Sequence, residues 1–245
     1  MKGLGFAFVS LLSLAVPATA ATADPVADFY AGKTLRMLVG YGPGGGYDIY
    51  GRLVAEFLPK YLPGHPAIVT ENMPGAGSFA AAKYMVTIAP RDGTVLGCLA
   101  QTFPLNSAVG GANKTNAAEF RYIGRVTTNI DVGAALASSG IASIADVRAK
   151  TYTVGASGRG STTDIYPEAL NAYGGTKFKI VLGYKGTAEI LLAMDRGEVD
   201  IEGAYGLPGM LVTHPDWIDK GKAVLTRLGW RLQRTTQARF YVRPE

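Results

Sequence analysis

Four glycine-rich segments carry the residues of this sequence that could do chemistry. They are residues 41–48, 72–78, 155–161 and 183–187, and each follows a short apolar run and precedes a run with helical periodicity. Glycine lets a ligand approach the backbone without a Cβ in the way. The first N–H groups of a helix have no partner inside it, and its dipole places positive charge there. Such junctions therefore predict binding of an anion by backbone donors.

The first segment is close to the glycine fingerprint of dinucleotide-binding proteins. Gly42, Gly44 and Gly46 lie between a strand-like run and a helix-like run, which is the context that this fingerprint needs. Tyr47, however, stands where the third glycine belongs, and the candidate ribose-binding acid, Glu71, lies in the run toward the second glycine segment. An exported enzyme with a Rossmann-like nucleotide site therefore remains an alternative interpretation.

Ser157 and Ser161 are the serines in these segments that could act as ester-hydrolysing nucleophiles. Their surroundings do not match the Gly-x-Ser-x-Gly nucleophile elbow. A serine nucleophile also needs a histidine, and His65 and His214 each stand beside a proline in a loop-like segment. Ester hydrolysis is therefore a second form of the enzyme alternative, and the main expectation is that the chain is not an enzyme.

Cys98 is the only cysteine of the chain. A single cysteine excludes an intrachain disulfide and a cysteine-based zinc site. It lies in the apolar run 95–99, which predicts an inert thiol in a buried strand. The two histidines have no histidine partner at metal-ligand spacing, so we expect neither a metal nor a cofactor.

The elements that must position the glycine segments alternate between strand-like and helix-like runs. Strands are predicted near 35–39, 67–69 and 95–99, and the helix after the first segment carries Ile49, Leu53 and Phe57 on one face. Ser143 is a candidate N-cap for a helix over 144–150. This alternation predicts an α/β protein with mostly parallel sheets flanked by helices.

A less patterned stretch after Gln101 separates two clusters of these units. It predicts two lobes that divide near residues 124–129, with a first lobe over 24–125 and a second lobe over 126–226. Ligands of open parallel sheets bind outside the carboxyl ends of the strands, which is where all four glycine segments lie.

Residues 1–23 have the pattern of a secretory signal. Lys2 supplies the positive end, and the apolar run 4–16 is too short to span a bilayer. Small residues then offer cleavage after Ala20 or Ala23. The sequence therefore predicts export to the periplasm.

The net charge of +5 does not predict a nucleic-acid partner. Lys2 belongs to the signal, and residues 227–245 carry five arginines against one acid, which is a net +4. Subtracting one and four from +5 leaves about zero for residues 24–226. A neutral body has no electrostatic footprint for phosphate backbones, so no nucleic acid is expected.

Several motifs in this order resemble the substrate-binding receptors of tripartite tricarboxylate transporters, the TctC or Bug family. They are the strand and glycine segment over 35–48, the Glu-Asn-Met-Pro-Gly-Ala-Gly run 71–77, the turn 90–94 and the Tyr-Lys-Gly run 184–186. The resemblance covers roughly residues 29–219. It implies a two-lobed periplasmic-binding-protein fold of type II.

The resemblance also implies a function and a site. The ligand would be a small carboxylate (a tri- or dicarboxylate, an aromatic acid or an amino acid), delivered by a monomer to the membrane subunits of the transporter. The first two loops of the family hold one ligand carboxylate by backbone groups, and the second lobe closes over the other end. The ligand-binding residues expected here are Tyr41, Gly42, Gly44, Gly45, Gly46, Tyr47, Asp48, Gly75, Ala76, Gly77, Ser78, Gln101, Thr102, Ser157, Arg159, Ser161, Thr162, Tyr184, Lys185, Gly186, Thr187 and Glu202.

Some of these side chains have two interpretations. Arg159 is either a solvated loop residue or a bidentate clamp for a second carboxylate. Asp48 either contacts the ligand or caps its own helix, and Lys185 is expected to stabilise its own turn. Glu202 lies where the second lobe could meet an ammonium or a hydroxyl group.

The C-terminal residues depart from the family pattern. Family members continue well beyond the equivalent of Leu225 and return to the first lobe, whereas residues 227–245 form a divergent, arginine-rich tail. The hypothesis from the sequence is a truncation or frameshift near Leu225. The tail has no clear hydrophobic period, so nothing in it predicts packing.

Overall fold

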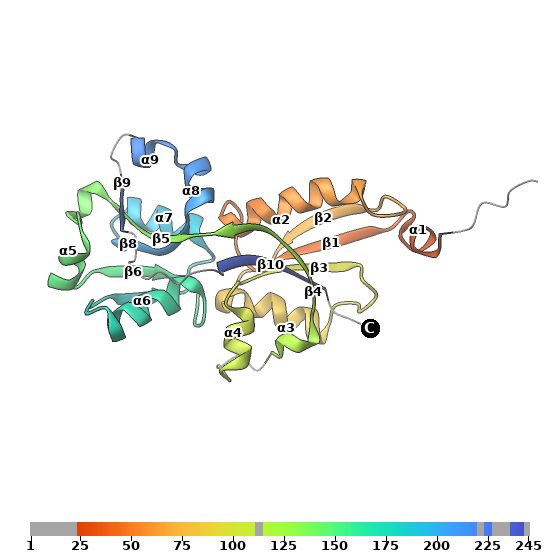
Figure 1. Cartoon of the computed structure of the whole chain (residues 1–245), viewed down its shortest axis with the longest axis horizontal. Coiled ribbons are helices and arrows are strands. Elements are labelled where there is room, and N and C mark those ends of the chain that lie inside the picture. Colours follow the sequence, from red (N-terminus) through yellow and green to blue (C-terminus); the bar gives the residue numbers. More distant parts are fainter. Residues whose placement is uncertain (1–23, 111–114, 220–222, 227–235, 243–245) are drawn as a thin grey trace, which may run out of the picture.

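The computed structural model describes residues 24–110, 115–219, 223–226 and 236–242. Their elements form two lobes side by side, each built on one five-stranded sheet (Figure 1). The predicted signal segment, residues 1–23, lies outside the described residues. No helix of the described ranges is both long and apolar enough to cross a membrane.

The first sheet has the strand order β2-β1-β3-β10-β4. Its parallel part comprises β1, β2 and β3, and β10 pairs antiparallel with both β3 and β4. The bounds of these strands are Thr34–Val39 for β1, Ala67–Asn72 for β2, Val95–Leu99 for β3, Arg121–Asn129 for β4 and Thr236–Val242 for β10.

Helices cover both faces of the first sheet, with α2 on one face and α3 and α4 on the other (Figure 1). The central strands are therefore buried on both sides: Met37, Leu38, Cys98 and Leu99 have no exposed surface. The helices of this lobe are α1 (Pro25–Tyr30), α2 (Gly46–Phe57), α3 (Phe79–Thr87) and α4 (Phe103–Ala108), with 3-10 turns at Leu58–Lys60, Ala76–Ser78 and Ala117–Glu119.

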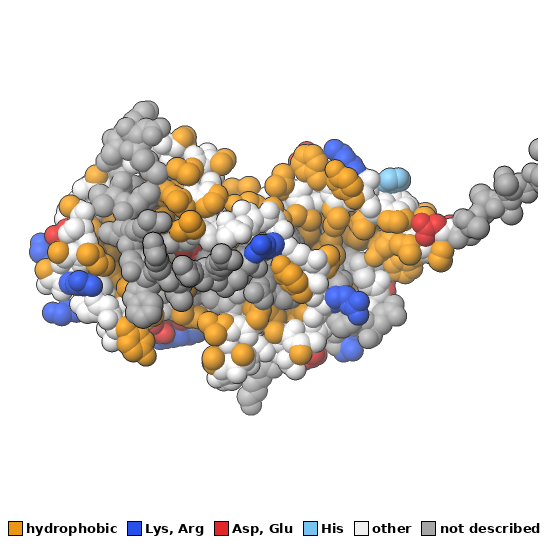
Figure 2. Space-filling view, viewed as in Figure 1, with side chains coloured by type: hydrophobic (Ala, Val, Ile, Leu, Met, Phe, Trp, Pro, Cys, Tyr) orange, Lys and Arg blue, Asp and Glu red, His pale blue; other side chains and the backbone are white. Residues whose placement is uncertain are grey.

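The α2 helix turns a different face to the sheet from the one that its sequence suggests. Ile49, Leu53 and Phe57 are between 36% and 42% exposed, and they form part of the apolar surface over α2 (Figure 2). The residues that α2 buries are Asp48, Gly51 and Ala55. A Cβ on Gly51 would lie 2.6 Å from Val39 Cγ2, so the small residues let the helix pack closely on β1.

The second sheet has the order β7-β6-β8-β5-β9. Strand β6 pairs parallel with β7 and β8, and β5 pairs antiparallel with β8 and β9. The strands are β5 (Asp131–Leu136), β6 (Thr153–Ala156), β7 (Lys179–Leu182), β8 (Ile201–Gly206) and β9 (Ala223–Thr226), and the helices are α5 (Ile144–Ala149), α6 (Thr162–Tyr173), α7 (Thr187–Asp195), α8 (Leu207–Thr213) and α9 (Asp216–Asp219), with a 3-10 turn at Ala137–Ser139.

The predicted strand–glycine–helix units are present in both lobes. The helix predicted after Ser143 is α5, and Ser143 and Asp146 form a reciprocal capping box at its start. Each sheet also carries an antiparallel part beside the parallel strands. The α/β class with sheets flanked by helices is thus confirmed.

The lobes are joined through β4 and β5. Strand β4 pairs with β10 as far as Asn129, and β5 begins two residues later at Asp131 (Figure 1). The crossover therefore lies at Ile130, slightly later in the chain than the expected boundary between residues 125 and 126. Strand β10 was not predicted at all, because the tail that contains it shows no strand periodicity.

The packing of the second lobe depends on Ile190 of α7. This side chain has no exposed surface, and its Cγ2 lies 2.6 Å from where a Cβ on Gly155 of β6 would be. We expect Ile190→Ala to leave a cavity against β6 and to lower the free energy of unfolding in urea by about 2–5 kcal/mol. Leu192→Ala on the same helix is the control, because Leu192 is 54% exposed and should change stability by less than about 0.5 kcal/mol. Equal losses in the two variants would contradict this packing.

Candidate functional site

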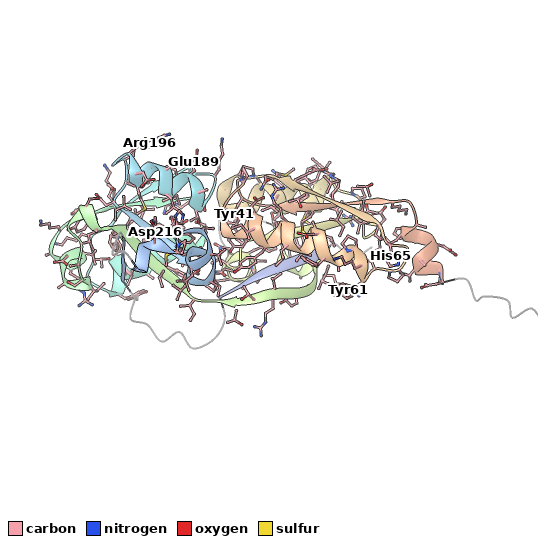
Figure 3. All side chains as sticks on the ribbon, turned by 90° about the horizontal axis from the view of Figure 1, so that it is seen from above. Tyr41, Tyr61, His65, Glu189, Arg196 and Asp216 are labelled. Atoms are coloured by element: carbon pink, nitrogen blue, oxygen red, sulfur yellow. The ribbon has the colours of Figure 1, made fainter. Side chains whose placement is uncertain are left out.

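A cleft lies between the two lobes, at the carboxyl ends of strands from both sheets. It has a volume of about 60 Å³, which is enough to admit water or a small ligand. Tyr41, which lines the cleft, lies at the junction of the lobes, whereas Tyr61 and His65 lie toward the far end of the first lobe (Figure 3). The cleft is lined by Tyr41, Gly45, Gly46, Tyr47, Tyr50, Gln101, Asn129, Asp131, Ser157, Thr162, Thr163, Gly186, Thr187, Ala204, Tyr205, Gly206 and Gly209.

Three helices begin at this cleft. The first residues of α2, α6 and α7 are Gly46, Thr162 and Thr187, and all three line the wall. The first N–H groups of each helix have no acceptor within the helix, and each N-terminus carries a partial positive charge. The three helix starts therefore supply backbone donors for an anion without any basic side chain.

Asp48 fixes the loop that precedes α2. Its Oδ2 accepts hydrogen bonds from the Gly44 amide and from Arg52 Nε, both at 2.9 Å, and its Oδ1 accepts one from Asn72 Nδ2 at 2.8 Å. The Asn72 amide also donates to the Tyr41 carbonyl at 2.9 Å. Burial opposes ionisation of Asp48, but the hydrogen bonds from Arg52, Gly44 and Asn72 outweigh it and hold the pKa below its usual value. Asp48 thus shapes the loop rather than lining the cleft.

Hydrogen bonds between loops hold the lobes together beside the cleft. The Gly42 amide donates to the Lys185 carbonyl at 2.7 Å, and Thr102 Oγ1 donates to the Gly160 carbonyl at 2.7 Å. At the second glycine loop, a Cβ on Gly158 would lie 2.4 Å from the Gly77 nitrogen. The lobes therefore meet through loops that tolerate only glycine at their closest approach.

The expected carboxylate cradle of the second loop has a different environment. Gly75, Ala76, Gly77 and Ser78 do not line the cleft; Gly77 packs against the 158–161 loop, and Ser78 Oγ accepts a hydrogen bond from the Ala100 amide at 2.8 Å. Of the residues expected at the ligand, the structure brings these to the cleft wall: Tyr41, Gly45, Gly46, Tyr47, Gln101, Ser157, Thr162, Gly186 and Thr187.

The other expected residues lie behind or beside the wall. Ser161 is fully buried and donates to the Gly158 carbonyl at 2.8 Å. Lys185 is exposed, and its amide donates to Glu189, which fits the expectation that it stabilises its own turn. The residues outside the wall are Gly42, Gly44, Asp48, Gly75, Ala76, Gly77, Ser78, Thr102, Arg159, Ser161, Tyr184, Lys185 and Glu202.

Arg159 is engaged within its own lobe. Its Nη1 contacts Asp164 Oδ1 at 3.4 Å and Glu168 Oε1 at a shorter distance, and its side chain is 64% exposed. An arginine that already faces two carboxylates has its charge neutralised. This geometry supports the solvated-loop interpretation of Arg159 over the clamp.

Two acidic side chains lie on the second-lobe side, Asp131 in the cleft wall and Glu202 buried outside it. Asp131 accepts hydrogen bonds at 2.7 Å from Gln101 Nε2 and Asn129 Nδ2, and burial raises its pKa to about 7. Glu202 is fully buried, and its Oε1 accepts a hydrogen bond from Thr187 Oγ1 at 3.4 Å. Burial, and then the nearby charge of Asp131, raise the pKa of Glu202 well above its usual value.

Four tyrosines are among the described residues that line the cleft. Tyr41 and Tyr47 stack with their ring centroids 4.3 Å apart and 13° between their planes. The Gln101 amide donates to the Tyr47 hydroxyl at 3.1 Å, which fixes that ring. Tyr50 and Tyr205 add two further rings to the wall. The cleft therefore presents flat, aromatic surfaces between its backbone donors and its acids.

The side chains that could act in hydrolysis are not assembled. Ser157 Oγ lies 3.3 Å from Thr163 Oγ1, whereas His65 contacts the Pro59 carbonyl and His214 stacks on Trp217. Burial raises the pKa of the Cys98 thiol to about 12, which makes it unreactive. Among the described residues, no group of three or more histidine, cysteine or acidic side chains is placed to hold a metal ion.

Some wall residues were not predicted from the sequence. They are Tyr50, Asn129, Asp131, Thr163, Ala204, Tyr205, Gly206 and Gly209. A signal for the last two exists, because Gly206 and Gly209 form a fifth junction between a strand and a helix. For Asp131 the signal is its position at the start of the extended run 131–137, shortly after the expected boundary between lobes.

The raised pKa of Asp131 predicts how stability depends on pH. Between its ordinary value of 3.8 and about 7, the folded protein binds a proton that the unfolded chain releases, so the free energy of unfolding falls as pH rises. We expect Asp131→Asn to flatten this decline between pH 4 and 7, by at most about 1.4 kcal/mol per pH unit. Urea unfolding across this range measures it. Asp195→Asn, at an exposed acid of α7, is the control. Parallel curves for wild type and Asp131→Asn would contradict the assignment.

Comparisons with known proteins address the fold. No family model matches the chain. A protein of Cupriavidus necator, described as "UPF0065 protein in gbd 5'region", is 39% identical over 94 residues, which are 38% of this chain and 26% of that protein. The match thus spans about a quarter of the length of this curated relative.

Two solved structures are similar over most of the chain. Periplasmic binding protein BugD is 17% identical, with a TM-score of 0.67, over 88% of this chain and 78% of its own. Rpa4515 of R. palustris, solved with adipate, is 19% identical, with a TM-score of 0.66, over 86% of this chain and 77% of its own. The fold implied by the TctC/Bug resemblance is therefore confirmed: the chain has the two-lobed α/β fold of the periplasmic binding proteins.

Proposed function

We propose that this protein is a periplasmic solute-binding receptor that captures a small carboxylate between its two lobes. The observation that carries the proposal is the convergence of three helix N-termini, those of α2, α6 and α7, on one cleft between the lobes. Backbone donors at such sites stabilise a carboxylate in a partly buried environment, where each is worth more than in water. The adipate bound to the similar Rpa4515 structure supports the same ligand chemistry.

The enzyme alternative has less support. Ser157 is bonded to a threonine rather than a histidine, and the first glycine loop is held by Asp48 and packed against Lys185 of the other lobe. The similar structures are binding proteins. Turnover of ester substrates or binding of NAD, without binding of any carboxylate, would favour the alternative instead.

Gly46 offers a direct test of the backbone donors. Its amide is at the first position of α2, where proline is tolerated, and Gly45 has the extended angles of φ −87° and ψ 170° that a residue before proline prefers. A Cβ on Gly46 would have no atom within 4 Å. We expect Gly46→Pro, which removes one N–H, to weaken carboxylate binding roughly tenfold to a hundredfold by calorimetric titration.

Gly46→Ala is the matched control, because it adds a Cβ and keeps the N–H. Circular dichroism and thermal melting should show the same fold in both variants. The panel is citrate, adipate, benzoate and amino acids, and a ligand should raise the melting temperature with its excess over Kd. Equal affinity of the two variants for a carboxylate that the wild type binds would refute backbone recognition by α2, and no binding of any carboxylate would refute the receptor.

Binding would proceed by hinge closure, with ligand contacts to both lobes favouring the closed arrangement. Gly158 tests this step, because its Cβ would overlap the Gly77 nitrogen of the other lobe at 2.4 Å. We expect ligand to compact the wild type in small-angle scattering, and Gly158→Ala to reduce both the compaction and the affinity. Gly124→Ala is the control, since its Cβ meets no atom within 4 Å. If ligand compacts Gly158→Ala as much as the wild type, the approach of Gly158 to Gly77 is not part of the closed arrangement.

The place and partners of the receptor follow from its resemblance to the TctC/Bug family. An exported receptor would deliver its ligand to the membrane subunits of a tripartite tricarboxylate-type transporter. The signal pattern over 1–23 supports export of the chain.

A further inference from the structure

We propose that the cleft selects ligands that carry a protonated nitrogen as well as a carboxylate, with the nitrogen placed against Asp131 and Glu202. This inference rests on the proposed function, because it concerns the other end of the same ligand. It separates amino acids and related amino carboxylates from the dicarboxylates that a purely anion-binding cleft would accept.

The first argument is the charge of the wall. None of the described residues that line the cleft is a lysine, an arginine or a histidine. The nearest candidate for a second carboxylate clamp, Arg159, is already paired with Asp164 and Glu168. The backbone donors of the helix starts can hold one carboxylate, but a second carboxylate would have to lie near Asp131. A second ligand carboxylate near Asp131 would be repelled by the Asp131 carboxylate, whereas a protonated amine in the same place would be attracted to it.

The second argument is the unused acceptor capacity of the two acids. Each oxygen of Asp131 accepts one amide hydrogen bond, from Asn129 or from Gln101, whereas a carboxylate has about four acceptor sites. Glu202 has no exposed surface, and its Oε2 has no hydrogen-bond partner among the described residues. A buried carboxyl oxygen without a donor is costly, and a bound ammonium group would supply the donor.

Glu202 lies close enough to the cleft wall to interact with a bound ligand. Its Oε1 accepts a hydrogen bond from Thr187, whose residue lines the cleft, and the next part of β8, Ala204 to Gly206, also lines it. Glu202 and Asp131 lie near enough to act on each other electrostatically. A cation between them would favour the ionised form of both carboxyl groups, and none of the described residues that line the cleft supplies one.

The third argument is the aromatic surface. Tyr41 and Tyr47 are stacked, and Tyr50 and Tyr205 complete a set of rings around the same space. Aromatic faces attract cations, including methylated ammonium groups that cannot donate hydrogen bonds. The rings and the acids therefore favour the same ligand group for two independent reasons.

The test compares ligands of nearly equal shape. Calorimetric titrations of the mature chain would use 4-aminobutanoate, 4-hydroxybutanoate and glutarate, together with alanine, lactate and malonate for a shorter spacing of groups. We expect the amino member of at least one set to bind at least about tenfold more tightly than its hydroxy and dicarboxylate counterparts. The trimethylammonium form of 4-aminobutanoate then separates hydrogen bonding from attraction to the rings.

Variants locate the selectivity. Asp131→Asn and Glu202→Gln should each reduce the preference for the amino ligand over the dicarboxylate by about tenfold or more. The control is Glu56→Gln, at an exposed acid of α2, which should leave the preference unchanged. Using both cleft variants keeps the test valid if one of them does not fold.

The outcomes distinguish the two proposals. Tighter binding of glutarate or malonate than of the amino ligands, unchanged by Asp131→Asn and Glu202→Gln, would overturn the inference and leave the receptor for carboxylates standing. Binding of amines that lack a carboxylate, as tightly as the amino acids, would also overturn it. The absence of binding by every ligand of both sets would count against the proposed function itself.

Discussion

The buried carboxylate of Asp48 is the interaction on which the cleft depends. It ties the Gly44 amide, the Arg52 guanidinium and the Asn72 amide together, and Asn72 in turn holds the Tyr41 carbonyl. These bonds join the end of β1, the start of α2 and the end of β2 into one rigid corner. The corner aims the first N–H groups of α2 at the other lobe, and it leaves the Tyr41 and Tyr47 rings stacked on the wall. Without it the glycine loop would have many conformations and no fixed donors.

The cleft combines two opposite electrostatic devices. On one side, helix N-termini supply positive potential from the backbone, which a change of side chain does not easily remove. On the other side, Asp131 and Glu202 supply acidic side chains whose pKa values are raised by burial. A site built in this way would favour a ligand with a negative group at one end and a positive group at the other. The backbone part depends on where the helices begin, and the acidic part depends on the particular side chains of this chain.

The sequence allowed the strand–glycine–helix units and the α/β class to be predicted, because apolar periodicity and glycine position are local signals. It did not allow the apolar face of α2 to be oriented: Ile49, Leu53 and Phe57 are exposed, since the close approach of Gly51 to Val39 decides which face packs. Contacts between the lobes could not be predicted from the sequence either. Gly77 was expected at the ligand, whereas it packs against the 158–161 loop, and this depends on how two distant loops meet. Asp131 was missed because a strand assignment does not reveal that a strand begins at a crossover.

The position of Asp131 at the passage from β4 to β5 ties two properties of the protein together. Asp131 and its hydrogen-bond donor Asn129 flank Ile130, where the chain first passes from one sheet to the other before it returns between β9 and β10. Any substitution there alters both the chemistry of the wall and the torsional stiffness of the joint. Affinity and the rate of opening can therefore not be adjusted independently at these positions. A change of ligand without a change of kinetics is more easily made at Tyr50, which lines the cleft from α2 of the first lobe, away from the passage between β4 and β5.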